Sequence, residues 1–287
     1  MKQILITGIN GFVGTNCTNT WNRNHKIYGV DIYQTAIEGV VRIFGWKELG
    51  KIPPVDAIVH LAGKAHDTKI KCLAKEYFEI NTELTQKIFD YFLLSDARTF
   101  IFFSSVKAVA DSVQGDILTE EAIPSPVGPY GVSKIKAEKY ILDKMSTFTS
   151  QQSDKRVYIL RPCMIHGPGN KGNLNLLYNV VKKGIPWPLG AYESRRSFCS
   201  IDNISFVVEQ LILRDTIESG VYNVGDDEPL SINELIRMIS ESVEKKTHIL
   251  KLPKGFIKTL ASLGSVLHLP LNNERLYKLT ENFVISN

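Results

Sequence analysis

Short apolar runs alternate with longer helix-like stretches through the first two thirds of the 287-residue chain, and this alternation restricts the possible folds more than any other feature. An apolar run of about four to eight residues is typical of a buried strand. Helical patterns between such runs are typical of a parallel sheet covered by helices on both faces. We therefore predict an α/β fold with a doubly wound parallel sheet. The apolar runs are QILITG, HKIYGVD, DAIVHLAG, TFIFFSS and RVYILRP, and the helix-like stretches include FVGTNCTNTW, EYFEINTELTQKIFDYFLL and YGVSKIKAEKYIL.

The pattern changes after Pro168. A Gly- and Asn-rich connection, GPGNKGNLNLL, is followed by shorter elements. A chain of 287 residues lies near the length at which one core stops growing and a second lobe appears. We predict a first domain over residues 1–168 and a smaller, mainly substrate-binding lobe over residues 169–287, of which residues 199–214 could pack back on the first domain.

Charge, cysteines and hydropathy exclude several classes of protein. The formal net charge of +4 is spread along the chain and aromatic residues do not interleave with basic runs, so we expect no nucleic-acid partner. The four cysteines stand far apart without a C-x-x-C pair, which indicates neither a metal site nor a disulfide framework and fits a cytoplasmic protein. The apolar stretch over residues 252–271 contains lysines and prolines, so we predict an amphipathic helix there rather than a membrane span, with peripheral membrane contact as the alternative.

A glycine-rich turn follows the first apolar run. In LITGINGFVG, Gly8, Gly11 and Gly14 stand between a predicted strand and a predicted helix. Glycine suits such a place because the turn is tight, the backbone must approach a pyrophosphate, and the helix packs closely on the sheet. The spacing is G-x-x-G-x-x-G, whereas the usual dinucleotide fingerprint is G-x-G-x-x-G. The interpretation as a dinucleotide loop therefore rests on the strand and helix around it.

Asp31 ends the second apolar run, about 20 residues beyond the glycine-rich turn. A carboxylate there can accept hydrogen bonds from both ribose hydroxyls of an adenosine, and it repels a 2′-phosphate. No arginine follows in DIYQT to receive such a phosphate. The sequence favours NAD over NADP as the cofactor, and the alternative is a turn aspartate that follows a buried strand.

Tyr130 and Lys134 stand four residues apart at the start of a predicted helix, after Pro129, so they share one helix face. A free tyrosine has a pKa of about 10 and is a poor base near neutrality. A nearby ammonium together with a positively charged nicotinamide favours the phenolate and would lower that pKa. Ser105 ends the preceding apolar run, at the edge of the sheet where ligands bind. We predict that Tyr130 exchanges a proton with a substrate oxygen that Ser105 holds.

The ordered set of motifs resembles the extended short-chain dehydrogenase/reductase family, the NAD-dependent sugar-nucleotide epimerases, dehydratases and reductases, along nearly the whole chain. The motifs are the glycine turn, Asp31, HLAG, EYFEINTELT, the serine strand end, Tyr130-x-x-x-Lys134 and RPCMIHGPG. The resemblance implies a Rossmann fold, a catalytic triad of Ser105, Tyr130 and Lys134, and dimerisation of the kind common among members. It also implies a cofactor site lined by Gly8, Ile9, Asn10, Gly11, Phe12, Gly14, Asp31, Leu61, Ala62, Gly63, Asn81, Ser104 and Lys134.

The segment from Arg161 to Asn203 resembles the bacterial branch that handles UDP-activated amino sugars for surface polysaccharides. This branch includes reductases of UDP-4-keto-6-deoxy-N-acetylhexosamine. A diphosphate is held by arginines and amide donors, and the resemblance implies Asn173, Arg195 and Arg196 for a UDP-sugar; the alternative for the arginines is a solvated charged pair. The usual tyrosine of VYGPG is His166 here, which we interpret as a packing or solvent-facing variant.

Three functions remain open from the sequence. Dehydratase relatives carry an Asp-Glu pair where Val106 and Lys107 stand, so elimination of water is disfavoured. The preferred hypothesis is a reductase that delivers one hydride to C4, because the KGN and RRSF segments resemble that branch most. The alternative is a UDP-sugar 4-epimerase that acts on UDP-glucose or UDP-N-acetylglucosamine. A catalytically inactive dinucleotide-binding protein is less favoured, since Ser105, Tyr130 and Lys134 are all present.

Overall fold

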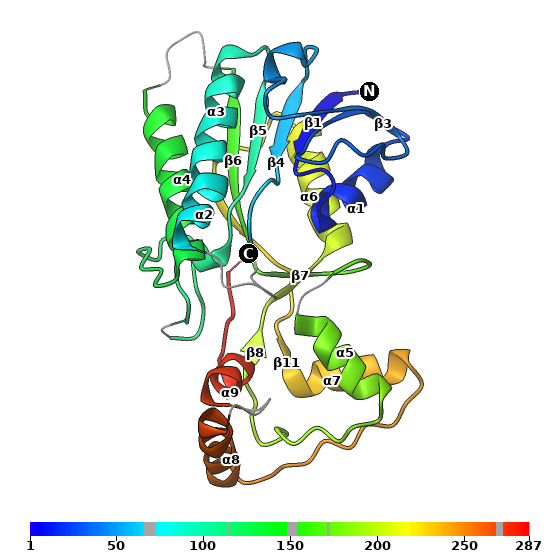
Figure 1. The fold of residues 1–287 in the computed structure, drawn as a ribbon, viewed down its shortest axis with the longest axis vertical. Helices are drawn as coiled ribbons and strands as arrows, with labels where there is room; N and C mark the ends of the chain where they lie inside the picture. Colours follow the sequence, from blue (N-terminus) through cyan, green and yellow to red (C-terminus); the bar gives the residue numbers. More distant parts are fainter. Residues whose placement is uncertain (66–72, 114, 148–153, 171–172, 268–271, 287) are drawn as a thin grey trace.

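A seven-stranded, wholly parallel sheet forms the centre of the molecule (Figure 1). The computed structural model describes residues 1–65, 73–113, 115–147, 154–170, 173–267 and 272–286. The strand order β10-β6-β5-β4-β1-β2-β3 is that of a doubly wound sheet, which confirms the predicted fold class. The strands are β1 (Gln3–Thr7), β2 (Lys26–Val30), β3 (Val40–Phe44), β4 (Ala57–His60), β5 (Thr99–Phe103), β6 (Arg156–Pro162) and β10 (Gly220–Val224).

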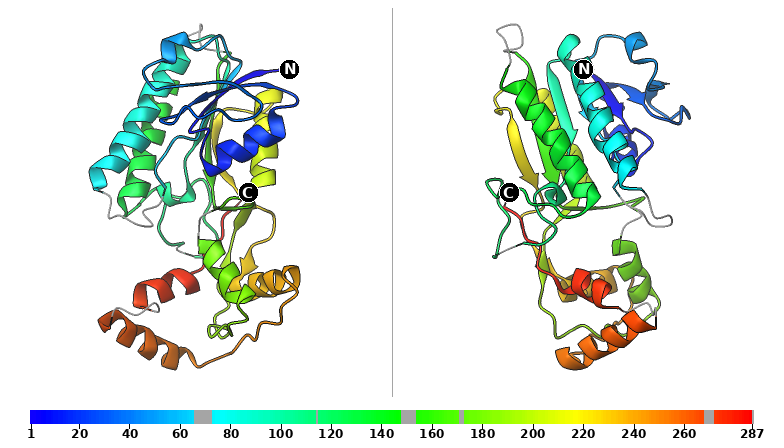
Figure 2. Two further views of the ribbon diagram at one scale, coloured as in Figure 1. Left: turned by 45° about the vertical axis from the view of Figure 1, so that its right-hand side comes forward. Right: turned by 60° about the vertical axis from the view of Figure 1, so that its left-hand side comes forward.

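Helices cover both faces of the sheet (Figure 2), because successive strand residues point to opposite faces and both faces are apolar. In β1, Ile4 and Ile6 pack in one core with α1 (Phe12–Trp21) and α6 (Ile201–Leu213). Leu5 points the other way, into the core that it shares with α3 (Leu84–Leu94) and α4 (Pro129–Met145). Helix α6 packs against α1.

The stretch expected as one helix before β5 has three parts. It begins as α2 (Ala74–Phe78), continues as a π-helical turn (Glu79–Glu83), and ends as α3. A π-turn widens the helix by one residue and often occurs at functional sites. Here it carries Asn81, one of the predicted cofactor-site residues.

The C-terminal residues form a smaller lobe beyond the carboxyl ends of the strands (Figure 1). A separate apolar core holds it together, with Trp187, Leu189 and Ile236 among its members. One segment differs from our expectation: β10 was predicted within this lobe, yet it pairs with β6 as an edge strand of the sheet. The division at residue 168 stays a prediction. The lobe contains α5 (Asn173–Lys182), α7 (Ile232–Ser242), α8 (Lys254–Val266), α9 (Asn273–Thr280), and the short strands β8 (Arg195–Arg196) and β11 (Leu230–Ser231); β7 (Met164–His166) pairs with β9 (Phe198–Ser200) above it.

The last described residues return from the lobe to the sheet. Phe283 donates its backbone N–H to the carbonyl of Arg195, and Ile285 bridges to Leu118. Phe283 and Ile285 are both buried in the core that contains β1. Within the described part of the chain, no helix combines the length and the hydropathy that crossing a membrane requires.

Candidate active site

The glycine-rich turn joins β1 to α1 with a geometry that only glycine allows. Gly8 has φ +70°, and a Cβ atom there would lie 2.7 Å from the backbone N and Cα of Ala62. A Cβ atom at Gly14 would lie 2.6 Å from the carbonyl oxygen of Ile9. Helix α1 starts after Gly11 without a side-chain cap. Its first N–H groups, at the positive end of the helix dipole, therefore fit a pyrophosphate.

The Asp31 carboxylate lies at the end of β2, beside this turn. One oxygen accepts a hydrogen bond from the backbone N–H of Asn10 (3.0 Å), and the other accepts from the N–H groups of Ile32 (2.7 Å) and Tyr33 (3.3 Å). Each carboxylate oxygen can accept more than one hydrogen bond. The backbone contacts thus fix the carboxylate in place and leave it acceptor capacity for ribose hydroxyls.

Gly63, Asn81 and Lys134 meet beyond the end of β4. A Cβ atom at Gly63 would lie 3.1 Å from both the Asn81 Oδ1 and the Lys134 Nζ atoms. The Asn81 side chain accepts from the Lys64 N–H (2.7 Å) and donates to the Lys64 carbonyl (3.0 Å) and to Ser133 Oγ (2.9 Å). Asn81 therefore links the loop after β4 to helix α4.

Tyr130 and Ser105 are brought together across the ends of α4 and β5. Their side chains are hydrogen-bonded to each other, and the Ser105 Oγ also accepts from the Lys107 N–H (3.2 Å). The Tyr130 ring packs edge-on against Tyr77, with 6.2 Å between the centroids. Lys134 is 5% exposed and donates from Nζ to the Phe103 carbonyl (2.7 Å). The three predicted triad residues thus lie at one edge of the sheet.

The ionisation of this pair differs from the sequence-based argument in one respect. Burial raises the pKa of Tyr130, its hydrogen bond with Ser105 acts in the opposite direction, and Tyr77 adds to the rise. Burial lowers the pKa of Lys134 to about 8, against the attraction of Glu138. The protein's own groups therefore keep Tyr130 a neutral phenol at neutral pH. Lowering of its pKa needs the additional positive charge of an oxidised nicotinamide.

Ser104, which was predicted to line the cofactor site, has a protein partner in the structure. Its hydroxyl donates to Oε1 of Glu138, a buried carboxylate on α4 that also binds Arg161. Sequence reasoning missed Glu138 and Arg161. The only available signal was the spacing of Glu138, eight residues after Tyr130 and four after Lys134 on the same helix face.

The predicted substrate residues lie in the C-terminal lobe. Arg195 is exposed and donates to the Pro229 carbonyl (2.7 Å), and Arg196 donates to the Glu281 carbonyl (3.2 Å). Asn173 begins α5, and its side chain lies outside the described part of the structure. Phe283 links β8 to the site at the strand ends. Its backbone N–H donates to the Arg195 carbonyl, and the Lys107 Nζ lies 4.5 Å from the centroid of its ring. His166 is half-exposed and lies 3.6 Å from an Asp226 oxygen.

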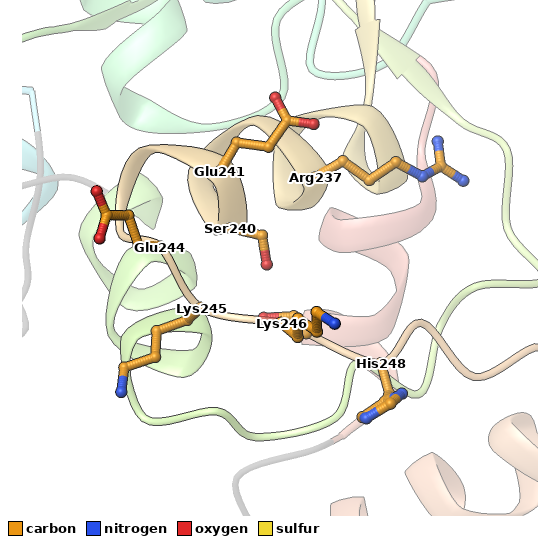
Figure 3. Close-up of a pocket in the computed structure, with 8 residues that line it drawn as sticks. Arg237, Ser240, Glu241, Glu244, Lys245, Lys246 and His248 are labelled. Carbon is orange, nitrogen blue, oxygen red and sulfur yellow. The ribbon is translucent and has the colours of Figure 1, made fainter.

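A hollow of about 560 Å³ lies elsewhere in the lobe, beside α7. Figure 3 shows that its charged side chains do not converge: those of Arg237 and Lys245 point in opposite directions. Among the described residues, no group of three or more His, Cys, Asp or Glu side chains could hold a metal ion. The site with convergent chemistry is therefore the one at the strand ends.

The fold and this site define a dinucleotide-dependent oxidoreductase of the short-chain type, with a lobe beyond the strand ends. Residues 4–225 match the model of the NAD dependent epimerase/dehydratase family, and the chain belongs to that family. It is 30% identical over 281 residues to a UDP-glucose 4-epimerase of Vibrio cholerae, covering 91% of this chain and 82% of that protein. It is 24% identical over 270 residues to a GDP-6-deoxy-D-mannose reductase of Pseudomonas aeruginosa, covering 88% and 84%. The structure of MoeE5 in complex with UDP-glucose and NAD has the same fold, with a TM-score of 0.70, 21% identity, and coverage of 86% and 84%.

Replacing Asp31 by Ala is expected to weaken NADH binding about tenfold and to leave NADPH binding unchanged or improved. Two hydrogen bonds from ribose hydroxyls to a carboxylate would be lost, and the repulsion of a 2′-phosphate would be removed. Fluorescence titration with each nucleotide measures the effect. Glu38→Ala, in the exposed loop that follows, is the matched control. An equal loss for both nucleotides would contradict the role of Asp31 in ribose recognition.

Proposed function

We propose that this chain is an NAD-dependent oxidoreductase of a UDP-activated sugar that reduces the C4 keto group of a UDP-4-keto-6-deoxy-N-acetylhexosamine for surface polysaccharide synthesis. The observation that carries the proposal is the partly buried Tyr130, which is hydrogen-bonded to Ser105 at the strand ends and whose pKa is raised by desolvation. A neutral phenol is the form that donates a proton to a carbonyl oxygen as hydride arrives at carbon. Reduction therefore requires Tyr130 as a neutral phenol, which is the form that its raised pKa favours.

Each residue has a defined part in this reaction. Bound NADH would supply the hydride. Ser105 would hold the substrate O4, Tyr130 would donate the proton to it, and Lys134 would hold the nicotinamide ribose and neutralise the phenolate that remains. Arg195, Arg196 and Asn173 would bind the diphosphate. The proposal extends to a cytoplasmic homodimer, and the three described cysteines, which are all free and buried, are consistent with a reducing compartment.

A UDP-sugar 4-epimerase is the second candidate, favoured by the 30% identity to the Vibrio cholerae enzyme. Epimerisation starts with oxidation at C4, for which Tyr130 must first act as a base. The positive charge of NAD would have to offset the pKa rise caused by burial.

One absorbance experiment separates the two candidates. Purified protein is mixed with NADH, or NADPH in parallel, and UDP-4-keto-6-deoxy-N-acetylglucosamine made by a separate dehydratase. The expected result is stoichiometric oxidation of NADH, with slower oxidation of NADPH. Conversion of UDP-N-acetylglucosamine to its C4 epimer without net oxidation would establish the epimerase instead, and inactivity in both assays would overturn both candidates.

A further inference from the structure

A buried carboxylate lies one helical turn beyond Lys134. Glu138 is 0% exposed and Arg161, on β6, is 5% exposed. The Arg161 guanidinium binds the carboxylate through Nη2 to Oε2 (2.6 Å) and through Nε to Oε1 (3.1 Å) and Oε2 (3.2 Å). Such a pair is costly to bury and strongly destabilising to break, so its position calls for an explanation beyond stability.

Three successive residues at the end of β5 are each bound by one side chain of the same face of α4. Phe103 accepts from Lys134, Ser104 donates to Glu138, and Ser105 is bonded to Tyr130. The α4 residues are four apart, which places them in one row along the helix. Glu138 therefore anchors the residue between the two that contact Lys134 and Tyr130.

We propose that Glu138, clamped by Arg161, is a positioning residue for the Lys134–Tyr130 pair: it holds the strand end that carries Ser105 and balances the buried ammonium charge of Lys134. This inference rests on the proposed catalytic role of Lys134. It goes beyond that role because it makes the charge state of Lys134 depend on Glu138, a residue that has no contact with substrate or cofactor in the proposed reaction.

The charges around Lys134 support this assignment. Burial lowers the pKa of Lys134, and Glu138 is the group that acts in the opposite direction. Among the other titratable groups, His60 on β4 interacts with the charge of Lys134, and Arg161 on β6 binds Glu138. Tyr130 lies one turn before Lys134 on α4, and Tyr77 packs against the Tyr130 ring. His60 is fully buried between Thr7 and Thr85, and its pKa is held well below its usual value by burial and by the charge of Lys134, so it is neutral.

The test replaces both partners of the ion pair. Glu138→Gln alone leaves Arg161 unpaired and could fail to fold, so the double variant Glu138→Gln/Arg161→Met is made beside it, because removing both buried charges is far better tolerated. Asp143→Asn, with the same loss of charge on the exposed face of α4, is the control.

The first readout is the pH dependence of acetic anhydride trace labelling of Lys134, followed by mass spectrometry, which needs no substrate. Only the neutral amine reacts, so the midpoint reports the pKa of Lys134. We expect the midpoint to fall by about one unit in Glu138→Gln, because a close opposite charge is lost, and to fall by less in the double variant, because the like charge of Arg161 is lost with it. Asp143→Asn is expected to leave it unchanged. A double variant that folds with an unchanged midpoint would overturn the proposal.

The second readout is the pH profile of NADH oxidation. The alkaline limb of kcat should move down with the labelling midpoint, and a fall of about one unit lowers kcat roughly fivefold at pH 8 and much less at pH 6.5. A uniform loss at all pH values would indicate a purely structural role and would overturn the proposal. A shifted labelling midpoint in a protein whose wild type oxidises no NADH would support the charge role of Glu138 and refute the proposed reaction.

Discussion

Replacing Tyr130 by Phe is expected to lower kcat for the keto-sugar reduction by about 10²- to 10⁴-fold, the usual contribution of a positioned proton donor. The hydroxyl that bonds Ser105 is lost, while the ring keeps its edge-on contact with Tyr77. The glycine turn and Asp31 lie at other strand ends and are untouched. NADH affinity and the thermal midpoint should therefore stay close to those of the wild type. Stopped-flow absorbance of NADH and a fluorescence titration measure the two quantities.

Tyr77→Phe is the matched control, because it removes the neighbouring phenol from the same aromatic contact. It is expected to change kcat by only a few fold, since Tyr77 has no assigned proton transfer. If Tyr130→Phe kept more than a tenth of the wild-type kcat, Tyr130 would not be the proton donor. If both variants lost activity equally, the aromatic packing would be responsible instead of the hydroxyl.

Replacing Gly8 by Ala is expected to abolish dinucleotide binding and to lower the free energy of unfolding by about 3 kcal/mol. Alanine is strained at φ +70°, and its Cβ would lie 2.7 Å from two backbone atoms of Ala62, which have no side-chain freedom to yield. Relief of the contact moves the end of β4 away from β1, and with it the loop that contains Gly63. Urea unfolding and NADH fluorescence measure the two effects.

Gly50→Ala is the control for this substitution. A Cβ atom at Gly50 meets nothing within 4 Å, so its stability and NADH affinity should stay near those of the wild type. Gly8→Ala with a normal affinity for NADH would show that the turn relaxes without cost. In that case the close approach of the ends of β1 and β4 would not require a glycine at position 8.

The sheet and the site edge could be predicted from the sequence because their signals are local. Apolar runs separated by helical patterns determine a parallel sheet, and the glycine turn, Asp31 and the Tyr130–Lys134 spacing each depend on a few neighbouring residues. The sequence does not indicate the π-turn at residues 79–83, because EINTE is typical of an ordinary α-helix. The edge strand β10 was assigned to the lobe because a short apolar run does not indicate which sheet it joins.

The ionisation of the site depends on residues that are distant in sequence. Glu138 reads as a polar residue of an amphipathic helix, yet it is fully buried because Arg161 reaches it from β6. The tyrosine was expected to have a pKa lowered by its lysine neighbour together with a positively charged nicotinamide; among the protein's own groups, burial dominates and raises that pKa.

By itself, the sequence determined the alternation of strands and helices, the glycine turn, and the candidate proton-transfer pair of Tyr130 and Lys134, since periodicity and turn chemistry act over a few residues. Only the tertiary structure decided which buried charges meet, which residues hold the end of β5, and in which protonation state Tyr130 and Lys134 stand. The physical reason is that desolvation and charge pairing depend on what surrounds a group in three dimensions.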